Sequence, residues 1–308
     1  MGHTRLNTAL LAIISCLLWS TAFAGVKIGL EYATPLQFAG TRFFIAGVLV
    51  FPIAYRFNPR FFSIVRSNLR LILLFAFLQT FLQYTMFYTG INMIPAAVAA
   101  IVIGSQPLFI ALVANFIMPG DRMTLSKTLA ILLGIAGVIL VSFEKDPQSA
   151  TGHIAVAGVL LMLGINLLSG FSNVLVAREK AMIPPLVISS SSMMLGGASL
   201  FLFSIPFEGL HIDSKPPIYF GSLVWLRLLS AIAIYIWIIL LKRPGTKVSD
   251  LNLWKFLIPM FGAIFSWILL PAEQPQAITI SGMFIITLAL IISGLLKRKK
   301  LSIIQEKA

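Results

Sequence analysis

A stripe of polar side chains runs along the apolar segment 71–91. Gln79 and Gln83 are four residues apart, as are Tyr84 and Tyr88, so in a helix both rows fall on neighbouring parts of one face. Two amides and two phenols on one face could hydrogen-bond the carboxylate or amine of a bound solute. The alternative is bonding between neighbouring helices, which contributes about 0.6 kcal/mol per bond on average. For the set as a whole we favour solute binding.

A second polar face is predicted in segment 154–176. Asn166, Ser169 and Asn173 follow one another at spacings i, i+3 and i+7, which places all three on one side of a helix. Gln106 adds a further amide beside a proline. These groups have the same two readings as the first stripe, a solute contact or a bond between helices.

Aromatic side chains could line the same cavity and stack on a flat or apolar solute. Trp19, Trp225, Trp237 and Tyr235 are the candidates. Trp and Tyr near helix ends also act as anchors at the membrane interface. We expect that anchoring role for Trp225 and Trp254.

Arg42 and Arg227 are interpreted as the cations inside apolar segments. A midplane arginine costs at least about 2.5–3.5 kcal/mol on insertion scales and by default indicates a functional site, here an anion contact. Arg42, however, is about 9 Å of helix rise from the outer end of its segment, within reach of the interface. We therefore expect both arginines to snorkel, with anion binding as the alternative.

The sequence offers no groups for catalysis at membrane depth. We place no Asp or Glu inside a predicted span, and His3, His153 and His211 fall in terminal or loop segments. No HExxH, GxSxG or His/Asp/Cys cluster indicates a general base or a metal site. We therefore predict no enzyme activity, no cofactor, no metal and no obligatory proton coupling.

The elements that carry these residues are predicted from composition. Hydrophobic residues make up 58% of the 308 and charged residues 11%, against roughly 25% charged in soluble domains. The apolar residues form runs long enough to cross a ~30 Å hydrocarbon core as helices. The predicted spans are 6–28, 36–55, 71–91, 96–118, 125–143, 154–176, 186–205, 218–241, 251–270 and 278–296.

The formal net charge of +13 reflects topology and not nucleic-acid binding. Sorting the 23 Lys and Arg by alternate loops puts most of them, Lys255 included, on one side. Only Lys27, Lys145 and Lys215 fall on the other. Basic loops stay in the cytoplasm, so both termini are predicted to be cytoplasmic.

The chain repeats itself at an offset of 152 residues. The pairs at this offset are Pro107 and Pro259, Pro119 and Pro271, and Asp121 and Glu273. Such self-similarity predicts two five-helix units, at 6–143 and 154–296, followed by a basic tail at 297–308. Because five is odd, the second unit is inverted relative to the first, the arrangement used by many secondary transporters. The alternative is a duplication without mechanistic use.

Pro107 and Pro259 lie near the middle of their predicted spans. A proline cannot donate to the carbonyl four residues back, which frees the carbonyls of Ile103 and Lys255. Such breaks are tolerated only against protein or a wet cavity, and paired breaks indicate a transporter site. The alternative is a packing kink. The repeat also makes Tyr84 and Tyr235 near-equivalent, so we expect one phenol from each half at a central cavity.

The N-terminus admits a second interpretation. Arg5, an apolar run and Ala22-Phe23-Ala24 resemble a signal peptide, and Ile13-Ile14-Ser15-Cys16 faintly resembles a lipoprotein box. Cleavage would remove the first span and the five-plus-five symmetry, so we favour a retained span.

Several short motifs, in order, resemble the EamA family of the drug/metabolite transporter superfamily. They are Leu18-Trp19-Ser20-Thr21-Ala22-Phe23-Ala24-Gly25-Val26-Lys27, Pro35 with Thr41-Arg42-Phe43, Pro107, Gly120-Asp121-Arg122-Met123-Thr124, Gly134 to Gly137-Val138, Tyr235, Pro259 and Ala272-Glu273. Asp121 replaces the family's usual Glu, and Pro275 interrupts the second turn. The resemblance implies a ten-helix exporter or importer of amino acids and other small metabolites.

These observations predict an all-α inner-membrane protein of ten helices that transports small metabolites, most plausibly amino acids or their relatives, by alternating access. The family resemblance alone favours export over import. The rival classes are a membrane-embedded enzyme and a passive channel. The expected partners are a small-molecule substrate and the lipid bilayer, not nucleic acid, for a monomer or homodimer. The predicted substrate-binding residues are Trp19, Gln79, Gln83, Tyr84, Tyr88, Gln106, Asn166, Asn173 and Tyr235, with Arg42 and Arg227 as possible anion contacts and Pro107 and Pro259 as helix breaks.

Overall fold

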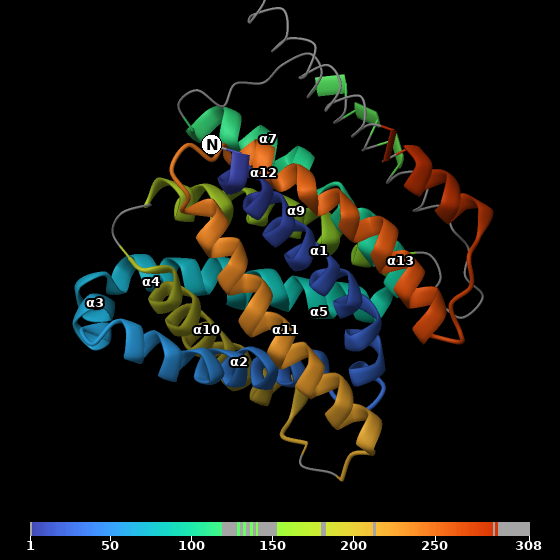
Figure 1. The fold of residues 1–308 in the computed structure, drawn as a ribbon. Helices are drawn as coiled ribbons and strands as arrows, with labels where there is room; N and C mark the ends of the chain where they lie inside the picture. Colours follow the sequence, from blue (N-terminus) through green and yellow to red (C-terminus); the bar gives the residue numbers. More distant parts are fainter. Residues whose placement is uncertain are drawn as a thin grey trace, which may run out of the picture.

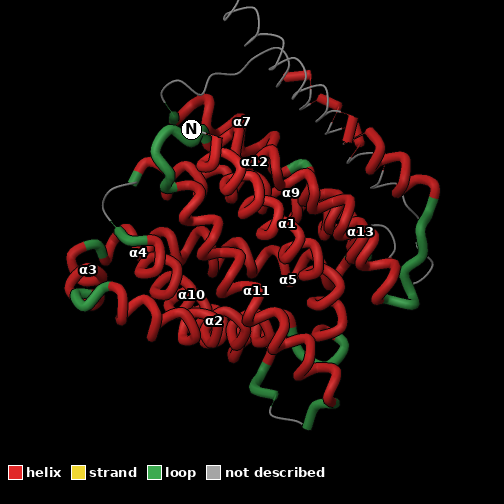
Figure 2. The backbone as a smooth tube through the Cα atoms, viewed as in Figure 1, coloured by secondary structure: helices red, strands yellow, loops and turns green. Residues whose placement is uncertain are grey.

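The computed structural model describes residues 2–118, 153–179, 183–211 and 214–285, with a few positions within 128–140 and residues 287 and 288. Every regular element in these ranges is helical (Figures 1 and 2). The predicted span 125–143, the end of the span 278–296 and the tail 297–308 lie largely or wholly outside the described residues.

Seven helices in the described part of the chain are long and apolar enough to cross a membrane. They are Asn7–Leu30, Pro35–Phe57, Leu69–Met93, Ala96–Ile117, Ala155–Arg178, Pro185–Glu208 and Pro217–Leu241. Each coincides with a predicted apolar run to within a few residues. Large apolar side chains such as Phe116, Leu202 and Phe207 are exposed on these helices, as a lipid environment requires.

The first half of the chain contributes α1 to α7. Their bounds are α1 (Gly2–Leu30), α2 (Pro35–Phe57), α3 (Phe61–Ser67), α4 (Leu69–Phe75), the π-helical segment η1 (Ala76–Leu82), α5 (Gln83–Met93), α6 (Ala96–Gly104) and α7 (Gln106–Ile117). The segment 71–91 is therefore not a regular helix as predicted. The wider turn of η1 interrupts it, and such π segments are frequent at functional sites.

The second half contributes α9 (His153–Arg178), α10 (Pro185–Glu208), α11 (Pro217–Leu241), α12 (Val248–Asn252), the 3-10 segment η2 (Leu253–Phe256) and α13 (Leu257–Leu269). The predicted continuous span 251–270 is thus divided, and only Leu257–Leu269 forms an apolar α-helix. Pro259 is the third residue of α13, where the first turn of a helix tolerates a proline.

Helices of the first half pack mainly against helices of the second. α2 lies against α10, α1 against α11 and α13, α6 against α13, and both α5 and α7 against α9 (Figure 1). Small residues allow the closest approach. A Cβ added to Gly40 would lie 2.5 Å from the Phe201 nitrogen, and one added to Gly197 would lie 2.2 Å from the Phe44 nitrogen. Such small-residue contacts are typical of helix packing in membranes.

Two carboxylates of the second half of the chain accept hydrogen bonds from helix N-termini of the first half. Glu208, at the end of α10, accepts hydrogen bonds from the backbone nitrogens of Leu36 (2.8 Å) and Gln37 (2.9 Å) at the start of α2. Glu273, which follows α13, accepts from the nitrogens of Ala96 (2.6 Å) and Ala97 (3.0 Å) at the start of α6. Each negative charge satisfies helix donors that have no intrahelical partner.

Candidate functional site

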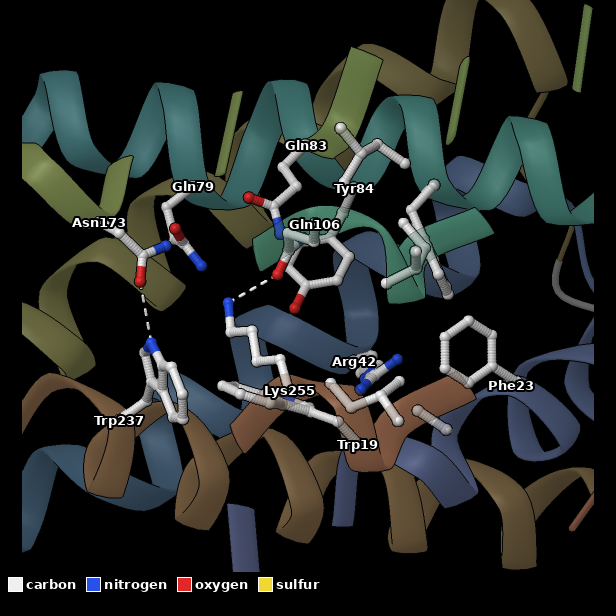
Figure 3. Close-up of a pocket in the computed structure, with 15 residues that line it drawn as sticks. Trp19, Phe23, Arg42, Gln79, Gln83, Tyr84, Gln106, Asn173, Trp237 and Lys255 are labelled. Atoms are coloured by element: carbon white, nitrogen blue, oxygen red, sulfur yellow. Dashed lines mark hydrogen bonds between the residues drawn. The ribbon is translucent and has the colours of Figure 1, made fainter. Parts of the chain in front are cut away.

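A pocket lies in the middle of the bundle, where helices of both halves converge (Figure 3). Its walls come from α1, α2, η1, α5, the α6–α7 break, α9, α11 and the η2–α13 break. Of the predicted residues, Trp19, Arg42, Gln79, Gln83, Tyr84, Gln106 and Asn173 line it. Both polar stripes therefore reach one cavity.

The two proline-associated breaks meet beside this pocket. α6 ends at Gly104, and α7 begins at Gln106 with Pro107 in its first turn. A Cβ added to Gly104 would lie 2.5 Å from Cγ of Pro259, so the two breaks are in contact. The breaks predicted at Pro107 and Pro259 therefore lie next to each other, with Gln106 and Lys255 within hydrogen-bond distance.

Lys255 lies inside the bundle, contrary to the prediction that places it among the cytoplasmic loop cations. It is only 5% exposed and lines the pocket. The 3-10 turn of η2 places it one turn before Pro259, inside the bundle. The signal was present, because Lys255 is the residue whose carbonyl Pro259 was predicted to free.

The ammonium group of Lys255 has polar and aromatic neighbours. Its Nζ donates to Oε1 of Gln106 at 2.6 Å and lies 4.8 Å from the ring centre of Trp237 and 5.3 Å from that of Trp19. The two indoles meet edge to face, with centroids 5.1 Å apart. Cation–π contact of this kind stabilises a desolvated ammonium by up to about 2 kcal/mol.

A chain of hydrogen bonds extends from Lys255 across the pocket. Nε2 of Gln106 donates to Oγ of Ser169 (2.8 Å), which donates to Oε1 of Gln83 (3.1 Å). The chain joins η2, α7, α9 and α5, so it links the two predicted polar stripes. Buried networks of this kind fix side-chain orientation when each member finds a partner.

Arg42 is buried, contrary to the expectation that it snorkels. It is 2% exposed, its Nε donates to the Leu226 carbonyl (3.2 Å) and Oγ of Ser230 (2.9 Å), and Nη1 donates to the Tyr88 hydroxyl (2.8 Å). Packing of α2 against α11 supplies the first two acceptors, which are far away in the sequence, and packing against α5 supplies Tyr88. Arg227 is half-buried, does not line the pocket, and has no hydrogen-bond partner for Nε in the described part of the chain.

The two tyrosines of the first stripe differ in position. Tyr84 lines the pocket, and its hydroxyl has no hydrogen-bond partner among the described residues. Figure 3 shows this ring facing the space between Gln106 and Arg42. Tyr88 is fully buried behind the pocket wall, where its hydroxyl accepts the bond from Arg42.

The second half contributes Asn173 and Trp237 to the pocket. Nε1 of Trp237 donates to Oδ1 of Asn173 at 3.0 Å (Figure 3). Tyr235, the expected counterpart of Tyr84, is half-buried and does not line the pocket. Asn166 does not line it either, because Nδ2 donates to the Val102 carbonyl and to Oγ of Ser105, both at 2.9 Å, at the α6–α7 break.

The residues that line the pocket include no Cys, His, Asp or Glu, and no group of metal-ligating side chains was found in the described part of the chain. The pocket instead combines two cationic, four amide and five aromatic side chains. This set can bind an organic solute by charge, hydrogen bonds and stacking.

Comparisons with known proteins agree with this architecture. Residues 6–143 match the family model described as the EamA-like transporter family. The "Uncharacterized transporter YvbV" of Bacillus subtilis is 25% identical over 99% of this chain and 98% of that protein. The "Probable amino-acid metabolite efflux pump" of Salmonella typhimurium is 28% identical over 92% of each, and its Escherichia coli namesake is 26% identical over the same shares.

A solved structure, titled "Crystal structure of protein", has the same fold. Its TM-score is 0.74 at 20% identity, over 95% of this chain and 98% of that one. The apolar helices are those of a multi-helix membrane protein, and the related proteins are named as transporters or efflux pumps. The first half of the chain is similar to the EamA-like transporter family, whose model it matches.

Proposed function

We propose that the protein is a secondary transporter that moves small organic metabolites across the inner membrane by alternating access, with amino acids and related compounds as first candidates. The observation that carries the proposal is the pocket at the contact between Gly104 and Pro259. It lies where the proline-broken segments of both halves meet, and such breaks mark the binding sites of transporters.

The proposal includes ten spans in two inverted five-helix repeats. The helix contacts support it, because they keep their pattern when the halves are exchanged. α1 with α11 corresponds to α9 with α5, while α2 with α10 and α6 with α13 each pair equivalent helices. Two halves related in this way can rock against each other around a fixed central site.

Export with both termini in the cytoplasm completes the proposal. The bias of Lys and Arg between alternate loops supports the orientation. Export is supported by the relatives named as probable amino-acid metabolite efflux pumps. Because the pocket-lining residues include no carboxylate, we propose exchange or facilitated movement without obligatory proton coupling.

The test is a metabolite screen by thermal shift on purified protein, followed by counterflow in liposomes. A transporter gives saturable, stereoselective uptake of labelled solute driven by unlabelled solute inside the vesicle. Conductance without saturation would favour a channel. Chemical turnover of a solute in detergent, without a second compartment, would favour an enzyme. Either result would overturn the proposal.

A further inference from the structure

Lys255 is a buried ionisable group, and no carboxylate is among the residues that line its pocket. Its Nζ bears three N–H donors, one of which is taken by the neutral oxygen of Gln106. Its other contacts are the faces of two indoles. Buried charges in proteins are normally paired with an opposite charge, because leaving water costs them several kcal/mol.

The ionisable Lys and Arg side chains that line the pocket are all basic. Lys255 and Arg42 both line it, and no Asp or Glu is among the lining residues. A solute with a negative group would compensate this field, whereas an ammonium group would meet two like charges and no carboxylate.

Lys255 and Arg42 differ in how far their N–H donors are available to a solute. Arg42 donates three bonds to Leu226, Ser230 and Tyr88, which bind it to the walls of the bundle. Lys255 projects into the middle of the pocket between Gln106 and the indole of Trp19 (Figure 3). Its unused donors are therefore placed to meet a solute.

We propose that Lys255 binds the carboxylate of an organic anion whose apolar or flat body lies against Trp19, Trp237 and Tyr84. This inference rests on the proposed transport function and names its substrate class. The carboxylate is the recognised group, and an α-amino group adds little to binding. The Gln106 oxygen shares or yields its place on Nζ when the carboxylate arrives.

The test separates the two charges of an amino acid. Four compounds with one skeleton are compared by thermal shift: L-phenylalanine, 3-phenylpropionate, L-phenylalaninamide and 3-phenylpropionamide. The same set is built on L-leucine with 4-methylpentanoate and the two amides. Both acids of at least one set should bind about ten- to a hundredfold tighter than the matching amides, the effect of a hydrogen bond between charged groups. Removing the ammonium should change affinity by less than about threefold.

Lys255 is then changed in two ways. Lys255→Met keeps the length and apolar stem without the charge, and the preference for acid over amide should fall to near one. Lys255→Arg keeps the charge and should retain the preference. Lys247→Met, at an exposed lysine, removes one charge elsewhere and should change nothing. A merely structural role for Lys255 would lower affinity for acid and amide alike.

The proposal is overturned if no carboxylate binds tighter than its amide, or if Lys255→Met keeps the preference. Counterflow distinguishes this failure from that of the transport function. Saturable exchange of amines or neutral solutes would leave a transporter whose site does not select anions. Failure of every solute to exchange would reject transport itself.

Discussion

Gly104 lies directly against the pyrrolidine ring of Pro259, so close that a Cβ on the glycine would be 2.5 Å from Cγ of the proline. The contact joins the end of α6 to the first turn of α13, the broken segments of the two halves. Gln106 and Lys255 extend from it into the pocket, where they are hydrogen-bonded to each other. The lack of a side chain at Gly104 therefore allows the two broken segments to meet beside the pocket.

Gly104→Ala should separate the two broken segments. The proline ring is rigid, so the overlap must be relieved by helix movement, at about 1–3 kcal/mol. We expect a lower melting temperature in detergent. Gly221→Ala is the control, since nothing lies within 4 Å of a Cβ there and alanine favours the helix. Equal stability of the two variants would show that the contact is not tight.

Tyr84→Phe should weaken solute binding, whereas Tyr88→Phe should lower the stability of the protein. The hydroxyl of Tyr84 faces the pocket, so its loss should weaken solute binding about two- to tenfold at unchanged melting temperature, the effect of one uncharged hydrogen bond. Loss of the Tyr88 hydroxyl removes an acceptor from buried Arg42 and should lower stability by about 1–3 kcal/mol. Binding assays beside thermal melts separate the two. If Tyr84→Phe binds normally, its hydroxyl does not contact the solute.

Glu273→Gln should loosen the start of α6. The carboxylate accepts from Ala96 and Ala97, and an amide retains one acceptor oxygen but no charge, so we expect a loss of about 0.5–2 kcal/mol. Glu208→Gln should do the same at α2. Thermal melts check both, with Glu31→Gln at an exposed site as the control. Unchanged melts for both variants would rule out a capping role.

The proposed topology is tested with single cysteines in a Cys16→Ser background. Cysteines at Ser63 and Ser302 should resist membrane-impermeant thiol reagents in intact cells, while one at Ser149 should react. Ser63 is exposed on α3, and Ser149 and Ser302 lie outside the described residues. Labelling at Ser302 would reverse the proposed orientation.

The lengths of the apolar runs were enough to predict most helices, because a helix needs about 20 apolar residues to cross the lipid bilayer. The helix breaks were also predictable, since Pro107 and Pro259 each remove a backbone donor. Gln79, Gln83 and Tyr84 reach the pocket because their spacing placed them on one face.

The positions of several other side chains depend on packing between helices, which the sequence does not show directly. Lys255 is close to a basic loop in the sequence, which favours its assignment to that loop. The 3-10 turn of η2 instead places it inside the helix bundle. Two of the three partners of Arg42, Leu226 and Ser230, are more than 180 residues away in the sequence. Tyr84 lines the pocket and Tyr235 does not; Tyr84 follows the π-helical segment η1, whereas Tyr235 lies within the regular helix α11. Trp237 occupies the pocket instead.

The central claim is that the pocket opens in turn to each side of the membrane. Gln79→Cys in the Cys16→Ser background places one thiol on the pocket wall, at a side chain without hydrogen-bond partners among the described residues. We predict that an impermeant thiol reagent labels it both in right-side-out and in inverted vesicles, and that saturating substrate slows both reactions. Ser63→Cys, the control, should react from one side only. Labelling of Gln79→Cys from a single side, unaffected by substrate, would contradict alternating access.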